Sequence, residues 1–229
     1  MISLAAKRMP IPTLLYEKRV DDTRVLHAKN LERAKKMEAD IHPDRASWNL
    51  QDVAFTSPAT VNTINVFAFR GVKDTNRAVM RQDDLGDIMN DFTGQLRAHH
   101  VNVNATKGYA GFGRDTHDDR LQTELQKEWW AESDRKDCLL FILPRKDFKR
   151  YSTIKRSADF EGYHSLCVVG NKIAQDDGNK TGFRWQHFSN LALKLNMKMG
   201  GDNHWLDSTS LNQAFGSHAL KKSTMIMGS

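Results

Sequence analysis

The amino-acid sequence predicts an α/β fold, a Rossmann-like three-layer domain in which helices flank a mainly parallel central sheet. Two observations lead to this prediction. Short β-branched or apolar runs alternate along the chain with segments whose apolar residues recur at helical spacing, which is typical of parallel strands joined by helices. The run Cys138–Leu143 contains no polar residue, which indicates a central strand covered on both faces.

The elements follow one another in this alternating order. Thr63–Phe69 is rich in β-branched and aromatic residues and predicts a buried strand, and Asp83–His99 has the apolar spacing of a helix. The next predicted elements are a strand at Val101–Ala105, a polar loop, and a helix at Leu121–Glu132. The remaining predictions are the central strand ended by Pro144, helix Phe148–Ala158, strand Ser165–Gly170, helix Trp185–Leu195 and a last strand at Ser223–Gly228.

The first 50 residues differ from the rest of the chain. They contain Pro10, Pro12 and Pro43, many charges, and a helix-like stretch from Val25 to Ala39 with only a narrow apolar stripe. We therefore expect a linker arm that leans on another part of the protein. Since the last predicted strand has nothing after it, we expect the chain to be part of a longer protein.

Positive charge is concentrated in one segment. The 229 residues include 34 Lys and Arg against 28 Asp and Glu, a net charge of +6, and Arg145–Arg156 holds six cations and one acid. This segment directly follows the central strand, at the carboxyl end where parallel sheets bind ligands. The pattern predicts a polyanionic partner, most simply nucleic acid.

Two pairs of residues predict a phosphate pocket beside an aromatic ring. Tyr151 and Lys155 are four residues apart and share a helical face, and Lys194 and Lys198 repeat this spacing on a second helix. Two such faces can converge on one anion. The plainer alternative is that both lysine-bearing faces are simply solvated.

Other candidate sites have simpler explanations. Gly108, Gly111 and Gly113 reverse the dinucleotide-binding spacing and predict a surface loop. His99 and His100 are adjacent and make a poor metal pair. Helix capping is the interpretation for three acids before a predicted helix, Asp115, Asp118 and Asp119. Of the adjacent Trp129 and Trp130, we expect one ring to face inward. We interpret Cys138 and Cys167 as buried free thiols.

Three segments together resemble the MID domain of eukaryotic Argonautes, of the fungal quelling type. They are I-L-P-R-K-D-F-K-R-Y-S-T-I-K-R from Ile142, G-Y-H-S-L-C-V from Gly162 and L-A-L-K-L-N-M-K-M-G-G-D-N from Leu191. W-N-L at Trp48 resembles the end of the family's linker, and M-I-M-G at Met225 resembles the first PIWI strand. The resemblance implies a linker at 1–50, a MID domain at 51–206 and the start of PIWI at 207–229.

The resemblance also implies a function, which is anchoring of the 5′-phosphorylated end of a small guide RNA. Tyr151 would stack on the first base and offer its hydroxyl to the phosphate, while Lys155, Lys194 and Lys198 would hold the phosphate oxygens. Leu166 departs from the family pattern because many relatives carry glutamine there, so that phosphate contact would be absent or supplied by another group. A loop would read the base through its backbone, and it comprises Arg145, Lys146, Asp147, Phe148, Lys149 and Arg150.

This chain is therefore expected to bind rather than catalyse, without a cofactor. The resemblance implies that the intact protein has PAZ and PIWI domains in cis, meets a target RNA, and cleaves it as a slicer with a divalent metal such as Mg²⁺. A nucleotide or cap-analogue sensor and a protein-interaction module are the alternatives. The sequence has no bilayer-spanning apolar run and no secretory signal, so we expect a cytoplasmic location without a membrane partner.

Overall fold

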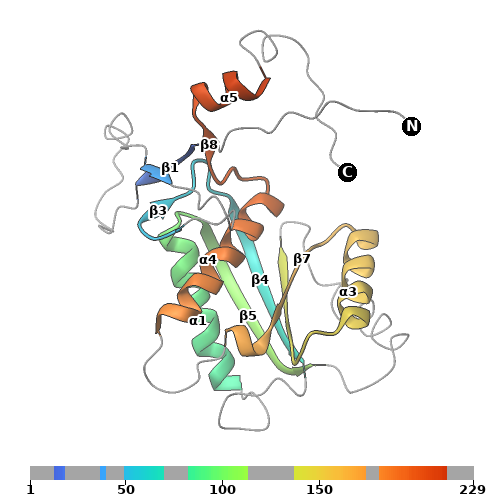
Figure 1. The fold of residues 1–229 in the computed structure, drawn as a ribbon. Coiled ribbons are helices and arrows are strands. Elements are labelled where there is room, and N and C mark those ends of the chain that lie inside the picture. The colour runs from blue at the N-terminus through green and yellow to red at the C-terminus, as the bar shows by residue number, and fades with distance from the viewer. Residues whose placement is uncertain are drawn as a thin grey trace, which may run out of the picture. The chain divides into compact units, whose positions relative to one another are not determined.

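A computed structural model gives the fold of the chain (Figure 1). It describes residues 13–18, 37–39, 49–69, 82–112, 137–173 and 181–215. The chain divides into two compact units, Ser57–Asn203 and a second unit formed by Met1–Thr56 with His204–Ser229. The predicted division at 50 and 206 stays a prediction.

A four-stranded parallel sheet forms the centre of the unit Ser57–Asn203. Its strand order is β5-β4-β6-β7, and all three pairings are parallel. The strands are β4 (Thr60–Phe69), β5 (Asn102–Phe112), β6 (Cys138–Leu143) and β7 (His164–Val169). Each parallel pairing needs a crossover connection, and after the edge strand β5 the chain crosses back past β4 to form β6 on its other side.

The two inner strands supply the core. Every residue of β6 is buried, as is every residue of β4 from Thr63 onward. Phe67 of β4 stacks on Phe141 of β6, with ring centroids 5.2 Å apart, and on Tyr109 of β5 at 5.0 Å. The apolar run at 138–143 is therefore a central strand, as the sequence predicted.

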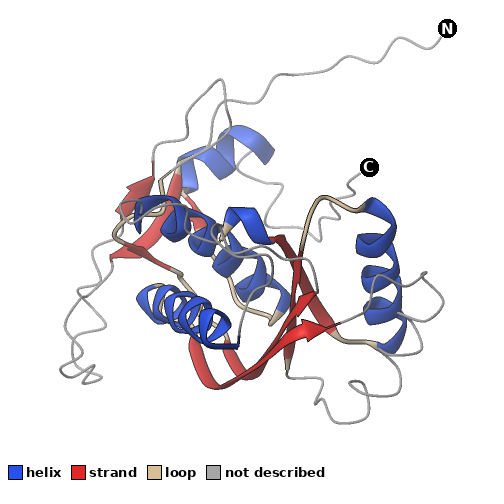
Figure 2. Cartoon of the chain, turned by 90° about the horizontal axis from the view of Figure 1, so that it is seen from below, coloured by secondary structure: helices blue, strands red, loops and turns tan. Residues whose placement is uncertain are grey.

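Helices cover both faces of this sheet. Helices α1 (Gln82–Ala98) and α4 (Thr181–Lys198) pack together on one face, where the rings of Phe92 and Phe188 lie 5.5 Å apart. Helix α3 (Phe148–Glu161) lies on the other face beside β7 (Figure 2), and a short 3₁₀ turn, η2 (Gly170–Lys172), follows β7. This arrangement confirms the predicted three-layer α/β fold.

Some element predictions were wrong in extent. Strand β5 continues to Phe112, so Gly108 lies in a strand paired with Val66 and not in a surface loop. A side chain at Gly108 would collide with Met89 of α1, and this close packing, which the glycine pattern does not reveal, explains the residue. Helix α4 extends three residues beyond Leu195 to Lys198.

Other predictions meet the described residues only in part. The end of the predicted helix Val25–Ala39 is a strand, β2 (Met37–Ala39), whose register with another strand overrides the weak helical stripe. The rest of that helix lies outside the described residues. So do the helix Leu121–Glu132 with its tryptophans, the aspartates of 115–119 and the strand Ser223–Gly228.

The second unit is built around one short strand, β1 (Leu14–Lys18). It pairs antiparallel with β2, β3 (Val53–Ala54) and β8 (Trp205–Leu206), and helix α5 (Ser208–Phe215) follows. Tyr16 is fully buried there, and its hydroxyl lies 3.2 Å from His204 Nδ1. Residues before 50 thus contribute strands to a small sheet.

Candidate anion-binding site

Helix α3 carries most of the predicted site, and both of its ends are fixed. Asp147 precedes the helix, and its side chain accepts a hydrogen bond of 3.0 Å from the Arg150 N–H, which is a standard N-cap. Gly162 ends the helix in the left-handed conformation, with φ of +79°, which favours glycine. The two caps therefore fix where α3 begins and ends, and so which of its side chains share a face.

Three predicted residues share one face of α3. Phe148, Tyr151 and Lys155 have the spacing i, i+3 and i+7, which places them along one side of a helix. The neighbouring side of the helix, which includes Ile154 and Ala158, is buried. The face that the sequence predicted from Tyr151 and Lys155 therefore exists and continues to the first residue of the helix.

Lys155 is held in place by β7. Its Nζ donates hydrogen bonds to the backbone oxygen of Ser165 and to the Ser165 Oγ, the latter at 2.9 Å. The same ammonium lies 5.8 Å from the centroid of the Tyr151 ring, within the range of a cation–π contact. An ammonium has three hydrogens, so one remains after the two bonds to Ser165.

The charge of Lys198 acts on two neighbouring groups, Lys155 and His164. Burial lowers the pKa of Lys155 below the ordinary 10.5, and the positive charge of Lys198 lowers it further. The pKa of His164 is also lowered, first by burial and then by Lys198. An anion bound near the half-buried Lys155 and the exposed Lys198 would offset the repulsion between their charges. Lys198 therefore lies within electrostatic range of Lys155, and the convergence of the two lysine faces on one anion stays a prediction.

Both lysines of α4 are exposed, and a hydrogen-bond network fixes the turn that carries them. The buried Asn196 accepts from the Ala59 N–H at 2.7 Å and donates to Asn203 Oδ1 at 3.0 Å. Asn203 in turn donates to the Leu193 carbonyl at 3.0 Å. Within the described part of the chain, no recorded interaction joins Lys194 to Lys155 or Tyr151, so its place in the site stays a prediction.

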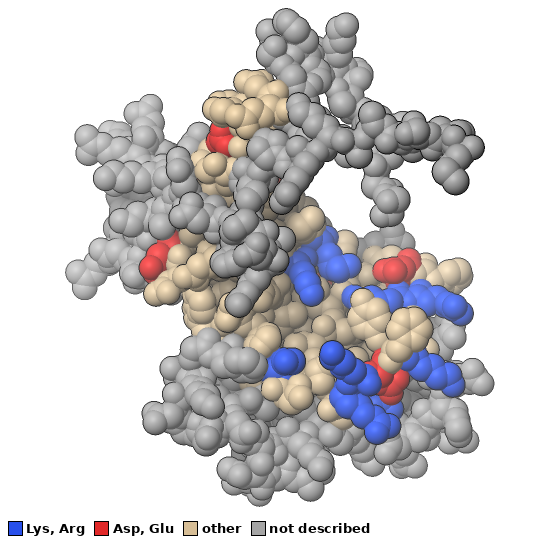
Figure 3. All heavy atoms as spheres, in the orientation of Figure 1, with Lys and Arg blue, Asp and Glu red and all other residues tan. Residues whose placement is uncertain are grey.

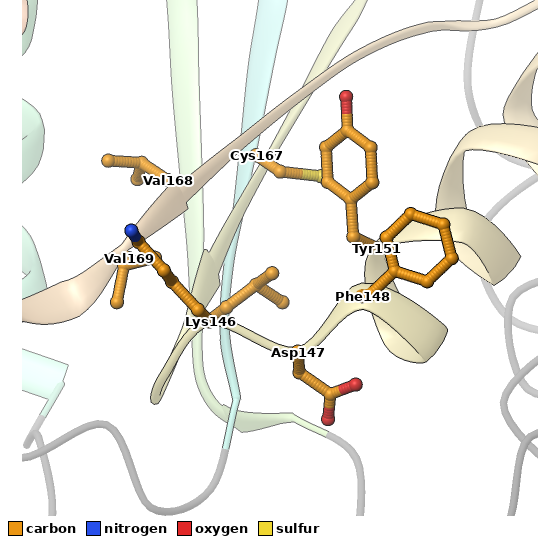
Figure 4. Close-up of a pocket in the computed structure, with 8 residues that line it drawn as sticks. Lys146, Asp147, Phe148, Tyr151, Cys167, Val168 and Val169 are labelled. Carbon is orange, nitrogen blue, oxygen red and sulfur yellow. The ribbon is translucent and has the colours of Figure 1, made fainter.

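A pocket of about 380 Å³ lies beside Tyr151 (Figure 4). It opens between the start of α3, the loop before it and the end of β7. Apart from Lys146 and Asp147 its lining is apolar or aromatic. The lining residues are Leu143, Lys146, Asp147, Phe148, Tyr151, Cys167, Val168 and Val169.

The structure divides the predicted base-reading loop. Lys146, Asp147 and Phe148 line the pocket, whereas Arg145 and Lys149 are exposed outside its lining. The Arg150 guanidinium lies over the Phe69 ring, 5.0 Å from its centroid, and so fastens the first turn of α3 to β4. Lys146 is exposed and also lines the pocket.

Leu166 lies away from the ligand face of β7. Its side chain is 2% exposed, while its neighbours Ser165 and Cys167 face α3. Because side chains alternate along a strand, no replacement for a glutamine contact comes from Leu166 itself. Sequence reasoning missed Ser165, although a serine two residues before Cys167 in an apolar strand was a usable signal.

The two cysteines near the site carry no negative charge at neutral pH. Burial raises the pKa of Cys167 to about 11 and that of Cys138 to about 12, and Lys155 and Lys198 offset only part of this rise. In the described ranges, no group of three or more His, Cys, Asp or Glu is placed to hold a metal ion.

Lys and Arg side chains gather over the region of α3 in the space-filling view (Figure 3). The segment Arg145–Arg156, which the sequence singled out, overlaps α3 and includes six Lys and Arg. The surface at the carboxyl end of β6 thus combines positive charge with an apolar pocket.

No described helix is long and apolar enough to cross a membrane.

Comparisons with known proteins agree with this arrangement. Residues 138–229 match the Piwi domain. The Caenorhabditis elegans protein tag-76 is 24% identical over 190 residues, which are 82% of this chain but 17% of that protein. The chain therefore spans about a sixth of the length of this curated relative.

Solved structures of similar fold include Argonautes. The N. crassa QDE-2 AGO MID-PIWI domains have a TM-score of 0.54 and 22% identity, covering 66% of this chain and 38% of that one. The Kluyveromyces polysporus Argonaute with a guide RNA has a TM-score of 0.54 and 18% identity, covering 87% and 22%. The resemblance predicted from the sequence is thus confirmed, since residues 138–229 match the Piwi domain and the chain shares its fold with Argonaute MID-PIWI structures.

Proposed function

We propose that this chain is a small-RNA-binding module that anchors the 5′-phosphorylated end of a guide RNA. The observation that supports this most is the position of Lys155, held by Ser165 beside the Tyr151 ring and within the electrostatic influence of Lys198. The similar Kluyveromyces polysporus Argonaute was solved with a guide RNA, which agrees with the same ligand here.

A terminal phosphate suits this set of groups better than an internal one. A phosphate monoester carries close to two negative charges near pH 7 and three acceptor oxygens. The remaining hydrogen of Lys155, the exposed Lys198 ammonium and the Tyr151 hydroxyl are donors for these oxygens, and Lys194 would add a fourth. An internal phosphodiester has one charge and would leave part of this set without a partner.

The first base would then lie against Tyr151. The Tyr151 side chain is 43% exposed and lines the pocket, so a base can cover its ring without displacing core residues. Stacking on an aromatic side chain contributes about 1 to 3 kcal/mol per base. The phosphate and the base together would fix the end of the strand and leave the rest of the RNA to other parts of the protein.

The test is a comparison of a short RNA with a 5′-phosphate and the same RNA with a 5′-hydroxyl. The 5′-phosphorylated RNA should bind at least tenfold more tightly, since loss of charged hydrogen bonds costs about 1.5 to 3 kcal/mol each. Lys155→Ala and Lys198→Ala should remove most of this difference. Arg156→Ala is the matched control because Arg156 is an exposed cation beside Lys155 on the same helix.

Equal losses in all three variants would contradict the proposal and indicate diffuse electrostatic attraction. Equal affinity for the two RNAs would also contradict it, and would favour a nucleotide sensor or a protein-interaction module instead.

We further propose that the intact protein is a cytoplasmic silencing effector with PAZ and PIWI domains in cis. In it the bound guide would pair with a target RNA, and PIWI acids with a divalent metal such as Mg²⁺ would cleave the target. The described residues offer no cluster that fits such a metal. This chain would contribute guide anchoring to the reaction, and the PIWI sheet would contribute the catalytic acids.

A further inference from the structure

We propose that Phe148 is a second stacking residue for the terminal base, and that the Phe148–Tyr151 pair favours a purine there. The inference rests on the proposed binding of a 5′-phosphorylated end and adds a side-chain determinant of which nucleotide is held. It starts from the exposure of Phe148, whose side chain is 85% accessible although it lines an apolar pocket.

The spacing along α3 connects this ring to the phosphate-binding groups. Phe148, Tyr151 and Lys155 follow one another on one face of the helix, and the Lys155 ammonium lies 5.8 Å from the Tyr151 centroid. A phosphate held at Lys155 therefore lies at one end of the row. The attached nucleoside extends along the row toward Tyr151 and then Phe148, where the pocket opens.

The lining of the pocket suits a flat aromatic group. Tyr151 and Phe148 come from α3, and Figure 4 shows both rings on the same side of the pocket, across from Val168 and Val169. The volume of about 380 Å³ accommodates a nucleobase together with part of its sugar. A two-ring purine can cover both aromatic side chains at once, whereas a one-ring pyrimidine covers less of the pair.

Few side-chain hydrogen-bonding groups are left to identify a base in the lining. Asp147 already accepts the Arg150 N–H as the helix cap, and its carboxylate points away from the two rings in Figure 4. Lys146 is a mobile point donor, which discriminates poorly among bases. Preference would therefore come from stacking area, which gives graded and not absolute discrimination.

The experiment measures binding of the 229-residue chain to adenosine 5′-monophosphate, uridine 5′-monophosphate and ribose 5-phosphate. The unaltered chain should bind the adenosine compound more tightly than the uridine compound. Phe148→Ala should lower the affinity for adenosine 5′-monophosphate by about tenfold, as expected for loss of one stacking side chain. The same substitution should reduce the difference in affinity between adenosine 5′-monophosphate and uridine 5′-monophosphate. It should leave the affinity for ribose 5-phosphate unchanged.

Phe160→Ala is the control, because Phe160 lies on the same helix and is 84% exposed but does not line the pocket. It should leave all three affinities unchanged. An unaltered preference in Phe148→Ala would overturn the inference. An equal loss for ribose 5-phosphate would overturn it as well.

These outcomes are separate from failure of the proposed function. That failure would appear in the unaltered chain as equal binding of adenosine and adenosine 5′-monophosphate.

Discussion

Ser165 offers the sharpest test of how the site is organised, because it touches Lys155 and not the ligand. It is 1% exposed and accepts a hydrogen bond of 2.9 Å from Lys155 Nζ through its Oγ. Ser165→Ala removes this bond but keeps the bond from Lys155 to the Ser165 backbone oxygen. The ammonium then has one fixed contact on β7 where it had two.

The expected effect on binding follows from the freedom that Lys155 regains. Immobilising one long side chain costs about 0.5 to 1.5 kcal/mol, so affinity for a 5′-phosphorylated RNA should fall by a factor of about 2 to 10. Affinity for the 5′-hydroxyl RNA should change little, since no phosphate then needs Lys155. Isothermal titration with both RNAs measures this difference.

A second buried serine supplies the control. Ser157 is 4% exposed, and its Oγ has no hydrogen-bond partner among the described residues. Ser157→Ala should leave binding unchanged and should not lower the free energy of unfolding, because a buried unsatisfied hydroxyl is itself unfavourable. An unchanged affinity in Ser165→Ala, or equal losses for both RNAs, would refute the assigned positioning role.

Two further predictions concern pH and packing. Affinity for the 5′-phosphorylated RNA should rise as pH increases through about 6, where the phosphate gains its second charge. It should fall again at alkaline pH below 10.5, because the lowered pKa of Lys155 means that this ammonium loses its proton earlier than an ordinary lysine; a titration series at constant ionic strength measures both limits. Gly201→Ala should lower the free energy of unfolding by about 1 to 3 kcal/mol in urea denaturation, since a Cβ there would collide with Asn196 and the Ser57 carbonyl. An unchanged urea midpoint would contradict this prediction and show that the turn accommodates the added Cβ without loss of stability.

The sequence predicted those parts of the fold that depend on local pattern. The apolar run 138–143 and the helical spacing of α1 and α3 each correspond to one element, so pattern alone identified them. The spacing of Tyr151 and Lys155 likewise predicted a shared face. The spacing of residues along the sequence could not predict that Ser165 holds Lys155, because that contact depends on how β7 lies against α3.

Gly108 and the loop before α3 show the same limit. Gly108 belongs to β5 because parallel pairing with β4 continues past Ala105 and α1 packs closely on it, and neither neighbour is near it in sequence. As a charged loop residue, Asp147 could have had several roles. The hydrogen bond that it accepts from the Arg150 N–H shows that it caps α3. Contacts between distant elements thus decided what local pattern left open.

The raised pKa values of the two thiols have a practical consequence. With pKa values of about 12 for Cys138 and about 11 for Cys167, the reactive thiolate is a very small fraction of either residue at neutral pH. Maleimide dyes should therefore modify both native cysteines slowly. A single cysteine introduced at the exposed Arg156 could carry a fluorophore next to the proposed site for the RNA end without first removing the native thiols.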